Sequence, residues 1–95
     1  MHAFIVATVR ITEPEAFGRY VGAIDGLAEH HDGRYIIRGA VTVMLEGEGM
    51  TGERVVAIEF PDVTAARGFY ESAVYQEAKL GRLGAAMLQM RLVED

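Results

Sequence analysis

Two charged residues, Arg38 and Glu59, interrupt stretches that are otherwise apolar and rich in β-branched residues. A charge within a strand is costly unless it is paired or lines a polar cavity. If both side chains project from the same face of a sheet, they form an ion pair. Arg38 would then stabilise a carboxylate, carbonyl or enolate, and Glu59 would accept a proton. The alternative is a structural pair that fixes sheet register or a dimer contact.

This pairing depends on the register of the expected hairpin. Closing the hairpin with Glu46 opposite Arg54 places Arg38 and Glu59 on opposite faces of the sheet, because side chains alternate along a strand. Their pairing therefore requires a β-bulge near Gly39 or a shift of one residue.

Five further residues are candidates for contacts with a ligand. Tyr70 and Tyr75 would place hydroxyl groups in an aromatic wall, although aromatic residues at this spacing are also typical of a helical core. Thr8 and Gln89 belong to the face of their strands that points away from the helices, where they line a pocket or form a polar rim. Arg82 either binds an anion at the pocket mouth or is a solvent-exposed loop charge.

No motif in the sequence indicates a metal or a cofactor, and we expect neither. Cysteine is absent, and His30 and His31 are adjacent rather than three or four residues apart. Histidine near the C-terminus of a helix interacts favourably with the helix dipole, which competes with a role as general base or haem ligand. Glycine-rich phosphate loops, nucleophile elbows and dinucleotide fingerprints are missing.

Composition limits the class of protein and its partners. Ninety-five residues are typical of one domain, expected here over residues 1–95. The net charge of −5 argues against a nucleic-acid partner. The apolar stretch at residues 3–9 is too short to span a membrane and lacks a signal-peptide layout, so we expect no membrane association and a cytoplasmic location. The 51% hydrophobic content favours an interface with a second copy.

The periodicity of the sequence predicts the elements that position these residues. Strands are expected over residues 4–11, 35–45, 54–60 and 86–93. A first helix starts at a capping box, Thr12 to Glu15, and closes at residues 30–33; its glycines at every fourth position indicate a close neighbour. A second helix starts after Asp62 and a short third one after Ser72. In the first strand, Ile5, Ala7, Val9 and Ile11 should lie beneath the helices.

The element order β-α-β-β-α-β predicts an α+β, ferredoxin-like fold with one antiparallel four-stranded sheet and its helices on a single face. The other face of such a sheet is left bare. A two-fold partner is the simplest cover for a bare apolar face, so we expect a homodimer whose sheets face each other in a barrel.

A set of residues spread over most of the chain resembles one known family. The set comprises Gly33 to Gly39, Glu46-Gly47, Arg54, Glu59 to Pro61, Ala66, Phe69-Tyr70, Ser72, Tyr75-Gln76 and Arg82. From about residue 20 to residue 93 the chain is thereby similar to the domain-of-unknown-function family 1330 (DUF1330). The resemblance implies a ferredoxin-like protomer of the dimeric α/β-barrel superfamily, whose members include cofactor-free monooxygenases, lactone isomerases and haem-related proteins. Fold analogy alone does not choose among these activities.

Three functions are compatible with these observations. The first is a homodimer with a small, mostly apolar pocket for an organic metabolite, enclosed by the facing sheets or lying between sheet and helices. If it is catalytic, we expect cofactor-independent isomerisation or proton transfer, with Glu59 as base, Arg38 as stabiliser and Tyr70 or Tyr75 orienting the ligand. The alternatives are a non-catalytic binding or interaction module and a cofactor-free monooxygenase. A filled, dry barrel interior favours the module; an open cavity containing both Arg38 and Glu59 favours an enzyme or ligand-binding protein.

Overall fold

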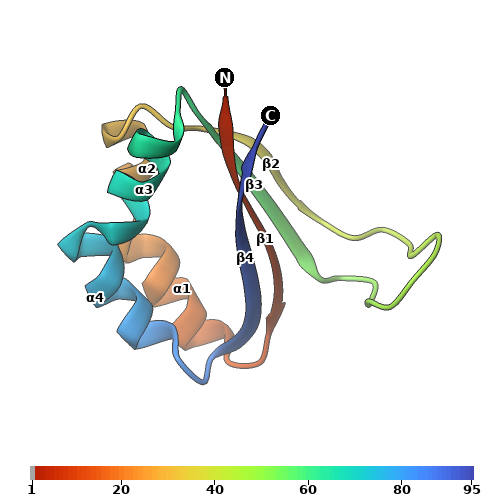
Figure 1. The fold of residues 1–95 in the computed structure, drawn as a ribbon. Coiled ribbons are helices and arrows are strands. Elements are labelled where there is room, and N and C mark those ends of the chain that lie inside the picture. The colour runs from red at the N-terminus through yellow and green to blue at the C-terminus, as the bar shows by residue number, and fades with distance from the viewer. Residues whose placement is uncertain (1) are drawn as a thin grey trace.

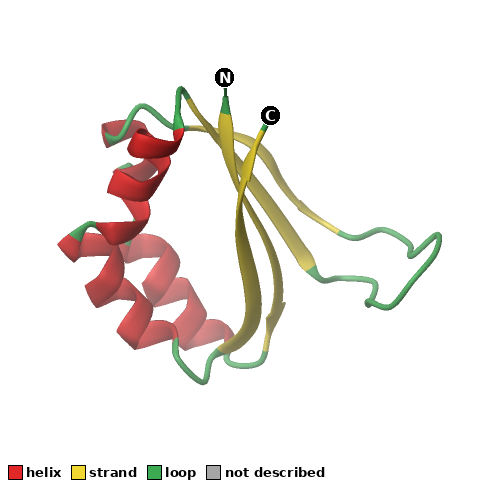
Figure 2. Ribbon diagram, viewed as in Figure 1, coloured by secondary structure: helices red, strands yellow, loops and turns green. Residues whose placement is uncertain are grey.

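A single antiparallel sheet carries all the helices on one of its faces (Figures 1 and 2). The structure is a computed structural model that describes residues 2–95. The strands lie side by side in the order β2-β3-β1-β4. The elements are β1 (Ala3–Ile11), α1 (Pro14–Ala23), α2 (Leu27–His30), β2 (Arg34–Ala40), β3 (Arg54–Phe60), α3 (Val63–Glu71), α4 (Ala73–Arg82) and β4 (Ala86–Glu94). The expected ferredoxin-like α+β fold is confirmed.

Strand β1 separates the two faces of the sheet by strict alternation. Ala3, Ile5, Ala7 and Val9 are buried beneath the helices, whereas the residues between them are only half-buried. Pairing of β1 with β3 and β4 places apolar residues of both neighbours on the same helix-covered side. We call the other side the open face; on β1 it comprises Phe4, Val6, Thr8 and Arg10. The largest fully buried side chains of the core are Tyr75, Phe60 and Phe69.

The first helical segment differs from the expected single helix. The chain adopts a left-handed conformation at Gly26, with φ of 77°, so α1 ends at Ala23 and α2 forms a separate short turn. The expected capping box is also absent: Thr12 Oγ1 donates instead to the carbonyl of Gly84, at 3.4 Å. A cap requires the hydroxyl to accept from the first helical turn, and here the hydroxyl contacts a neighbouring loop.

The caps of the later helices are confirmed. Asp62 Oδ1 accepts from the backbone N–H of Ala65 at 2.8 Å, which starts α3. Ser72 Oγ accepts from the N–H of Tyr75 at 3.1 Å, which starts α4. Helix α4 is ten residues long rather than a short turn, so it reaches Arg82 and packs along α1.

The β2–β3 connection is longer than expected. Strand β2 ends at Ala40, not at residue 45, and residues 41–53 form a loop that projects beyond the sheet (Figure 1). Its base is held by a backbone hydrogen bond from Val41 N–H to the carbonyl of Glu53, at 2.8 Å. Glu53 also accepts from Arg10 Nη2 at 3.0 Å. Glycine-rich sequence in this loop favours turns over continued pairing.

Candidate functional site

A cavity of about 170 Å³ lies between the sheet and the helices. Its walls are mainly aliphatic and aromatic side chains from β1, β3, β4 and α1, among them Ile5, Ala7, Phe17, Ile24, Val56 and Leu88. An engineered apolar cavity of about 150 Å³ binds benzene, so this volume suits a molecule with one six-membered ring.

Three polar residues meet at one wall of the cavity, and we call them the tyrosine cluster: Tyr20 on α1, and Tyr75 and Arg82 on α4. Both tyrosine rings line the cavity, and their hydroxyl oxygens lie 2.7 Å apart. Arg82 Nη2 donates to the Tyr75 hydroxyl at 3.3 Å, and its guanidinium lies 4.9 Å from the centroid of the Tyr20 ring. Burial raises the pKa of Tyr20, so this phenol remains protonated, and either hydroxyl of the tyrosine pair can be the donor.

Arg82 is buried, with only 7% of its surface exposed, and is therefore neither a loop charge nor a residue of the cavity mouth. Within residues 2–95, its Nε has no hydrogen-bond partner. Among residues 2–95 it forms no ion pair with a carboxylate. A buried positive charge without an acid is costly, so the Tyr75 hydroxyl and the Tyr20 ring carry its stabilisation.

Charged residues line the mouth of the cavity. Arg38 on β2 and Arg54 on β3 lie there with Asp25 and Glu29, which flank the start of α2. The Arg38 guanidinium stacks 4.0 Å from the centroid of the Tyr35 ring. Within the described chain neither arginine pairs with either carboxylate at 4.0 Å or less. The mouth therefore offers groups of both signs around an apolar interior.

The expected ion pair between Arg38 and Glu59 is wrong. Strands β2 and β3 pair Arg34 with Glu59 and Arg38 with Val56, with a register shift between Tyr35 and Ile37. Because the irregularity inserts one residue at position 36 rather than near Gly39, Arg38 faces the helices and Glu59 faces the open side. The two side chains lie on opposite faces of the sheet and do not form the expected pair.

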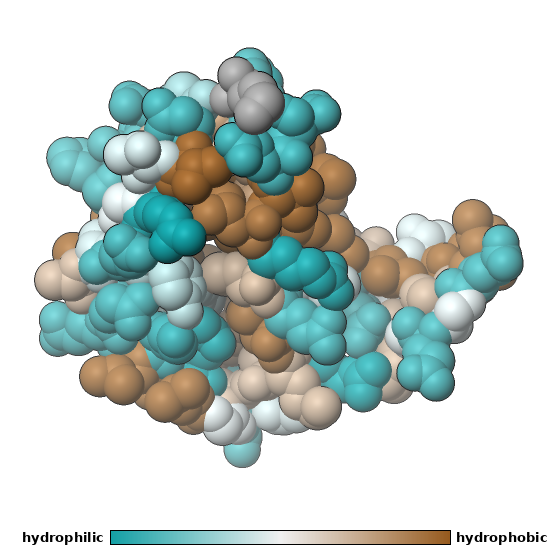
Figure 3. Space-filling view, in the orientation of Figure 1, coloured by the Kyte–Doolittle hydropathy of each residue, from teal (hydrophilic) through white to brown (hydrophobic). Residues whose placement is uncertain are grey.

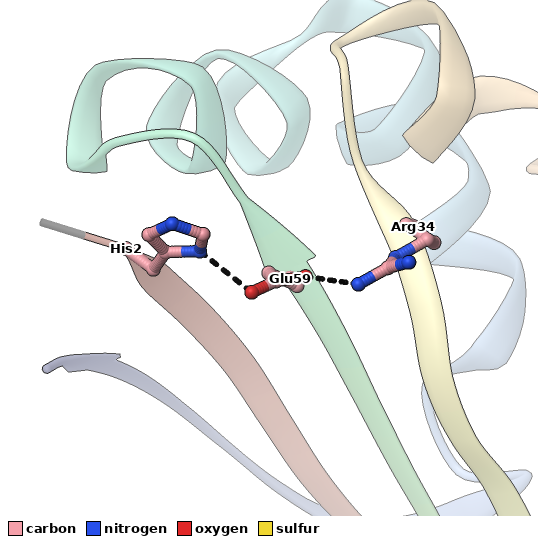
Figure 4. A network of polar contacts seen from close by, with 3 residues as sticks. All are labelled: His2, Arg34 and Glu59. Carbon is pink, nitrogen blue, oxygen red and sulfur yellow. Dashed lines mark hydrogen bonds and ion pairs between the residues drawn. The ribbon is translucent and has the colours of Figure 1, made fainter.

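Glu59 instead joins His2 and Arg34 on the open face, near the chain termini (Figure 4). Glu59 Oε2 lies 2.6 Å from His2 Nδ1, and Oε1 accepts from Arg34 Nη2 at 2.7 Å. Two hydrogen bonds hold the pKa of the Glu59 carboxyl below its usual value of 4.5; the one with Arg34 has the larger effect and the one with His2 the smaller. The trio links the residue before β1 to β3 and β2, and Arg34 takes the place beside Glu59 that was expected for Arg38.

The depressed pKa of Glu59 leads to a pH-dependent stability. Folding favours the ionised carboxylate, so its stabilising effect is complete above pH 4.5 and is lost as the pH falls through the lower folded-state pKa. We expect urea unfolding to show the wild type more stable than Glu59→Gln at pH 7, with the difference shrinking below pH 4.5.

The control for this experiment is Glu71→Gln. Glu71 pairs with Arg67 at 3.4 Å on α3, with both side chains more than 60% exposed, and such pairs contribute little. If Glu59→Gln and wild type lose stability in parallel on acidification, the proposed stabilisation of the ionised carboxylate is incorrect.

The other expected ligand contacts are dispersed. Thr8 and Gln89 face each other across β1 and β4 and line a shallow groove on the open face. Tyr70 lines an outer cleft between α3 and β4, where its hydroxyl accepts from Lys79 Nζ at 2.7 Å; this bond lowers the pKa of the phenol. Of the five predicted ligand contacts, only Tyr75 lines the cavity. Arg82 does not line the cavity but donates to the Tyr75 hydroxyl.

Tyr20 and Tyr35 line the cavity but were not among the predicted site residues. Tyr20 is buried and Tyr35 is half-buried, and the Tyr20 hydroxyl belongs to the tyrosine cluster. A tyrosine rather than a phenylalanine on a buried helical stripe is the one local signal, because a buried hydroxyl requires a partner.

The family model described as a domain of unknown function, DUF1330, matches residues 2–95. The chain belongs to this family. Its expected membership, inferred from about residue 20 onward, is thereby confirmed over the first strand as well. No curated protein matches the chain in sequence.

Solved structures of low sequence identity share the fold. A protein of unknown function from Rhodopseudomonas palustris is 22% identical, with a TM-score of 0.80 over 99% of this chain and 82% of its own. A dimeric ferredoxin-like protein of unknown function from Jannaschia sp. CCS1 is 14% identical, with a TM-score of 0.74 over 100% of both chains. SnoaB, a cofactor-independent oxygenase from Streptomyces nogalater, is 10% identical, with a TM-score of 0.68 over 99% of this chain and 92% of its own. At these identities the likeness establishes the fold alone.

Over residues 2–95, no helix has the length and apolarity needed to cross a membrane. Within the same residues, no three His, Cys, Asp or Glu side chains gather as a set of metal ligands.

Proposed function

We propose that this protein binds a small, mostly apolar organic metabolite in the cavity between its helices and its sheet. The observation that carries the proposal is a cavity of about 170 Å³ between the sheet and the helices of a domain of only 95 residues. Protein interiors are close-packed, and a void of this size forfeits contacts that a ligand would restore.

The proposal gives the sequence-predicted residues unequal roles. Tyr75 is the ligand contact within the cavity, and Arg38 lies at its mouth. Glu59 is separated from the cavity by the sheet, so it is not proposed as a base acting on a ligand there. A turnover reaction in this cavity would draw on Asp25 or Glu29 at the mouth as the nearest carboxylates and on Arg38 as electrostatic stabiliser.

Blocking the cavity tests the binding function. Val21 lines the cavity and is 40% exposed, so Val21→Trp adds bulk without disturbing the deep core. We expect methylenecyclohexane, followed by NMR chemical-shift changes, to bind the wild type and to lose at least tenfold in affinity for this variant, because tryptophan occupies the volume that the probe needs.

Val74→Trp is the matched control, because Val74 is a similarly exposed helical valine that does not line the cavity. Native mass spectrometry of freshly purified protein complements the titration by reporting any co-purified small molecule. If the wild type does not bind methylenecyclohexane, or if Val21→Trp and Val74→Trp have the same affinity for it, the cavity is not the binding site.

We also propose a homodimer in which the open faces of two sheets pack together. Phe4 and Val6 on β1 and Met87 and Val93 on β4 leave apolar surface on this face. Apolar residues also reach the surface at the tip of the loop between β2 and β3 (Figure 3), which extends beyond the sheet. Solved relatives of the same fold are themselves named as dimeric.

A charge placed on the open face tests the dimer. We expect sedimentation velocity at micromolar concentration to show a dimer for the wild type and a monomer for Val6→Asp, because moving a carboxylate from water into an apolar interface is costly. Leu80→Asp, on the exposed outer surface of α4, should remain dimeric. A monomeric wild type would refute the assembly.

A second candidate function is cofactor-independent oxygenation of an activated aromatic substrate. The observations that favour it are the ring-sized apolar cavity and the fold shared with the Streptomyces nogalater oxygenase. Oxygen uptake with a panel of hydroquinones separates this function from binding alone. Uptake that Val21→Trp abolishes would support oxygenation in the cavity; no uptake leaves the binding function.

A further inference from the structure

We infer that the ligand carries a carbonyl oxygen, which the tyrosine cluster (Tyr20, Tyr75 and Arg82) recognises at the wall of the cavity. The inference rests on the proposed function, since it concerns a ligand of that cavity. It follows from the hydrogen-bond arrangement of the cluster and from the buried charge behind it.

The hydrogens of the two phenols are not fully used within the protein. The hydroxyls of Tyr20 and Tyr75 share one hydrogen bond, at 2.7 Å, and Tyr75 also accepts from Arg82. If Tyr75 is the donor in the shared bond, the Tyr20 hydrogen has no acceptor. If Tyr20 is the donor, the remaining hydrogen of Tyr75 points to Met90 Sδ at 3.7 Å, a weak acceptor. Either arrangement leaves one phenolic O–H for a better acceptor.

The position of this hydrogen favours an acceptor on a ligand. Tyr20, Tyr75 and Met90 all line the cavity, so a bound molecule can approach the phenols directly. A buried hydroxyl without a good acceptor is unfavourable, and an oxygen of the ligand would satisfy it. The remaining walls are mainly apolar and suit the hydrocarbon body of the ligand.

Arg82 determines which kind of ligand group is favoured next to the phenols. Its positive charge is buried, lacks a carboxylate partner within the described residues, and contacts Tyr75 directly. A cation behind the phenol strengthens the phenol as a donor and favours a negatively polarised oxygen in front of it. A carbonyl oxygen meets both conditions without bringing a second full charge into the cavity.

The test compares two probes of the same shape, cyclohexanone and methylenecyclohexane, which differ only in C=O against C=CH2. In the double variant Tyr20→Phe/Tyr75→Phe we expect the affinity for cyclohexanone to fall about three- to tenfold, the effect of losing one hydrogen bond. The affinity for methylenecyclohexane should not fall. Tyr70→Phe, which removes a phenol that lies outside the cavity, should change neither affinity.

A second measurement uses only the wild type, so it tests the inference even if the double variant does not fold. Cyclohexanone labelled with ¹³C at the carbonyl should show a downfield shift when bound to the wild type, relative to the same ketone in hexane, as a hydrogen-bonded carbonyl does. A bound ketone with the hexane-like shift, or equal losses for both probes in the double variant, would overturn the inference.

The outcomes also separate this inference from the proposed function. If methylenecyclohexane binds and Val21→Trp blocks it while the carbonyl shows no hydrogen bond, the cavity binds ligands but the tyrosine cluster does not select a carbonyl. If neither probe binds the wild type, both proposals fail.

Discussion

Phe60→Ala is expected to lower the free energy of unfolding by about 3–5 kcal/mol, the usual cost of removing a fully buried aromatic side chain. Phe60 is 0% exposed at the end of β3, and its ring lies 5.5 Å from that of Phe69, centroid to centroid. A domain of this size has a total stability of about 5–15 kcal/mol, so the variant should be close to unfolding at room temperature. Urea denaturation followed by circular dichroism measures the change.

Phe60→Leu is the control for the loss of packing at this position. It keeps an apolar side chain of intermediate volume and should cost clearly less than alanine. The effect should also be independent of protein concentration, because Phe60 faces the helices and not the open face. Equal losses for the two substitutions would mean that packing volume does not set the stability here.

Gly33→Ala is expected to lower the free energy of unfolding by about 1–3 kcal/mol through overpacking. A Cβ at this position would lie 2.6 Å from Phe60 Cε1 and 2.9 Å from the carbonyl oxygen of Ala28. The ring is fully buried, and the carbonyl accepts from the Gly33 N–H at 2.7 Å, so neither neighbour can move freely. Thermal unfolding of the purified variant tests the expectation.

Gly18→Ala is the matched control, and its effect should have the opposite sign. Gly18 lies within α1, and nothing lies within 4 Å of a Cβ added there. Alanine is favoured over glycine in a helix interior, so this variant should gain about 0.5–1 kcal/mol. The same open space is found at Gly22, which corrects the expected close neighbour along this helix. A loss at Gly18 comparable to that at Gly33 would contradict the steric explanation.

The sequence by itself determined the features that depend on local chemistry. Alternation in β1 identified Ile5, Ala7 and Val9 as core residues, because each strand residue points to the opposite side from its neighbour. Asp62 and Ser72 were recognisable as caps because their side-chain oxygens reach backbone N–H groups only three residues away. Element order and the bare sheet face followed from these signals.

Only the tertiary structure decided which side chains meet. One inserted residue in β2 reverses the face on which every later residue of the strand lies. Arg38 therefore lies on the side of the cavity, and Arg34 is the partner of Glu59. Tyr20 and Tyr75, 55 positions apart, meet because α4 is long enough to pack along α1. Periodicity assigns a residue to a face, but the contacts across that face depend on register and helix packing, which no local pattern encodes.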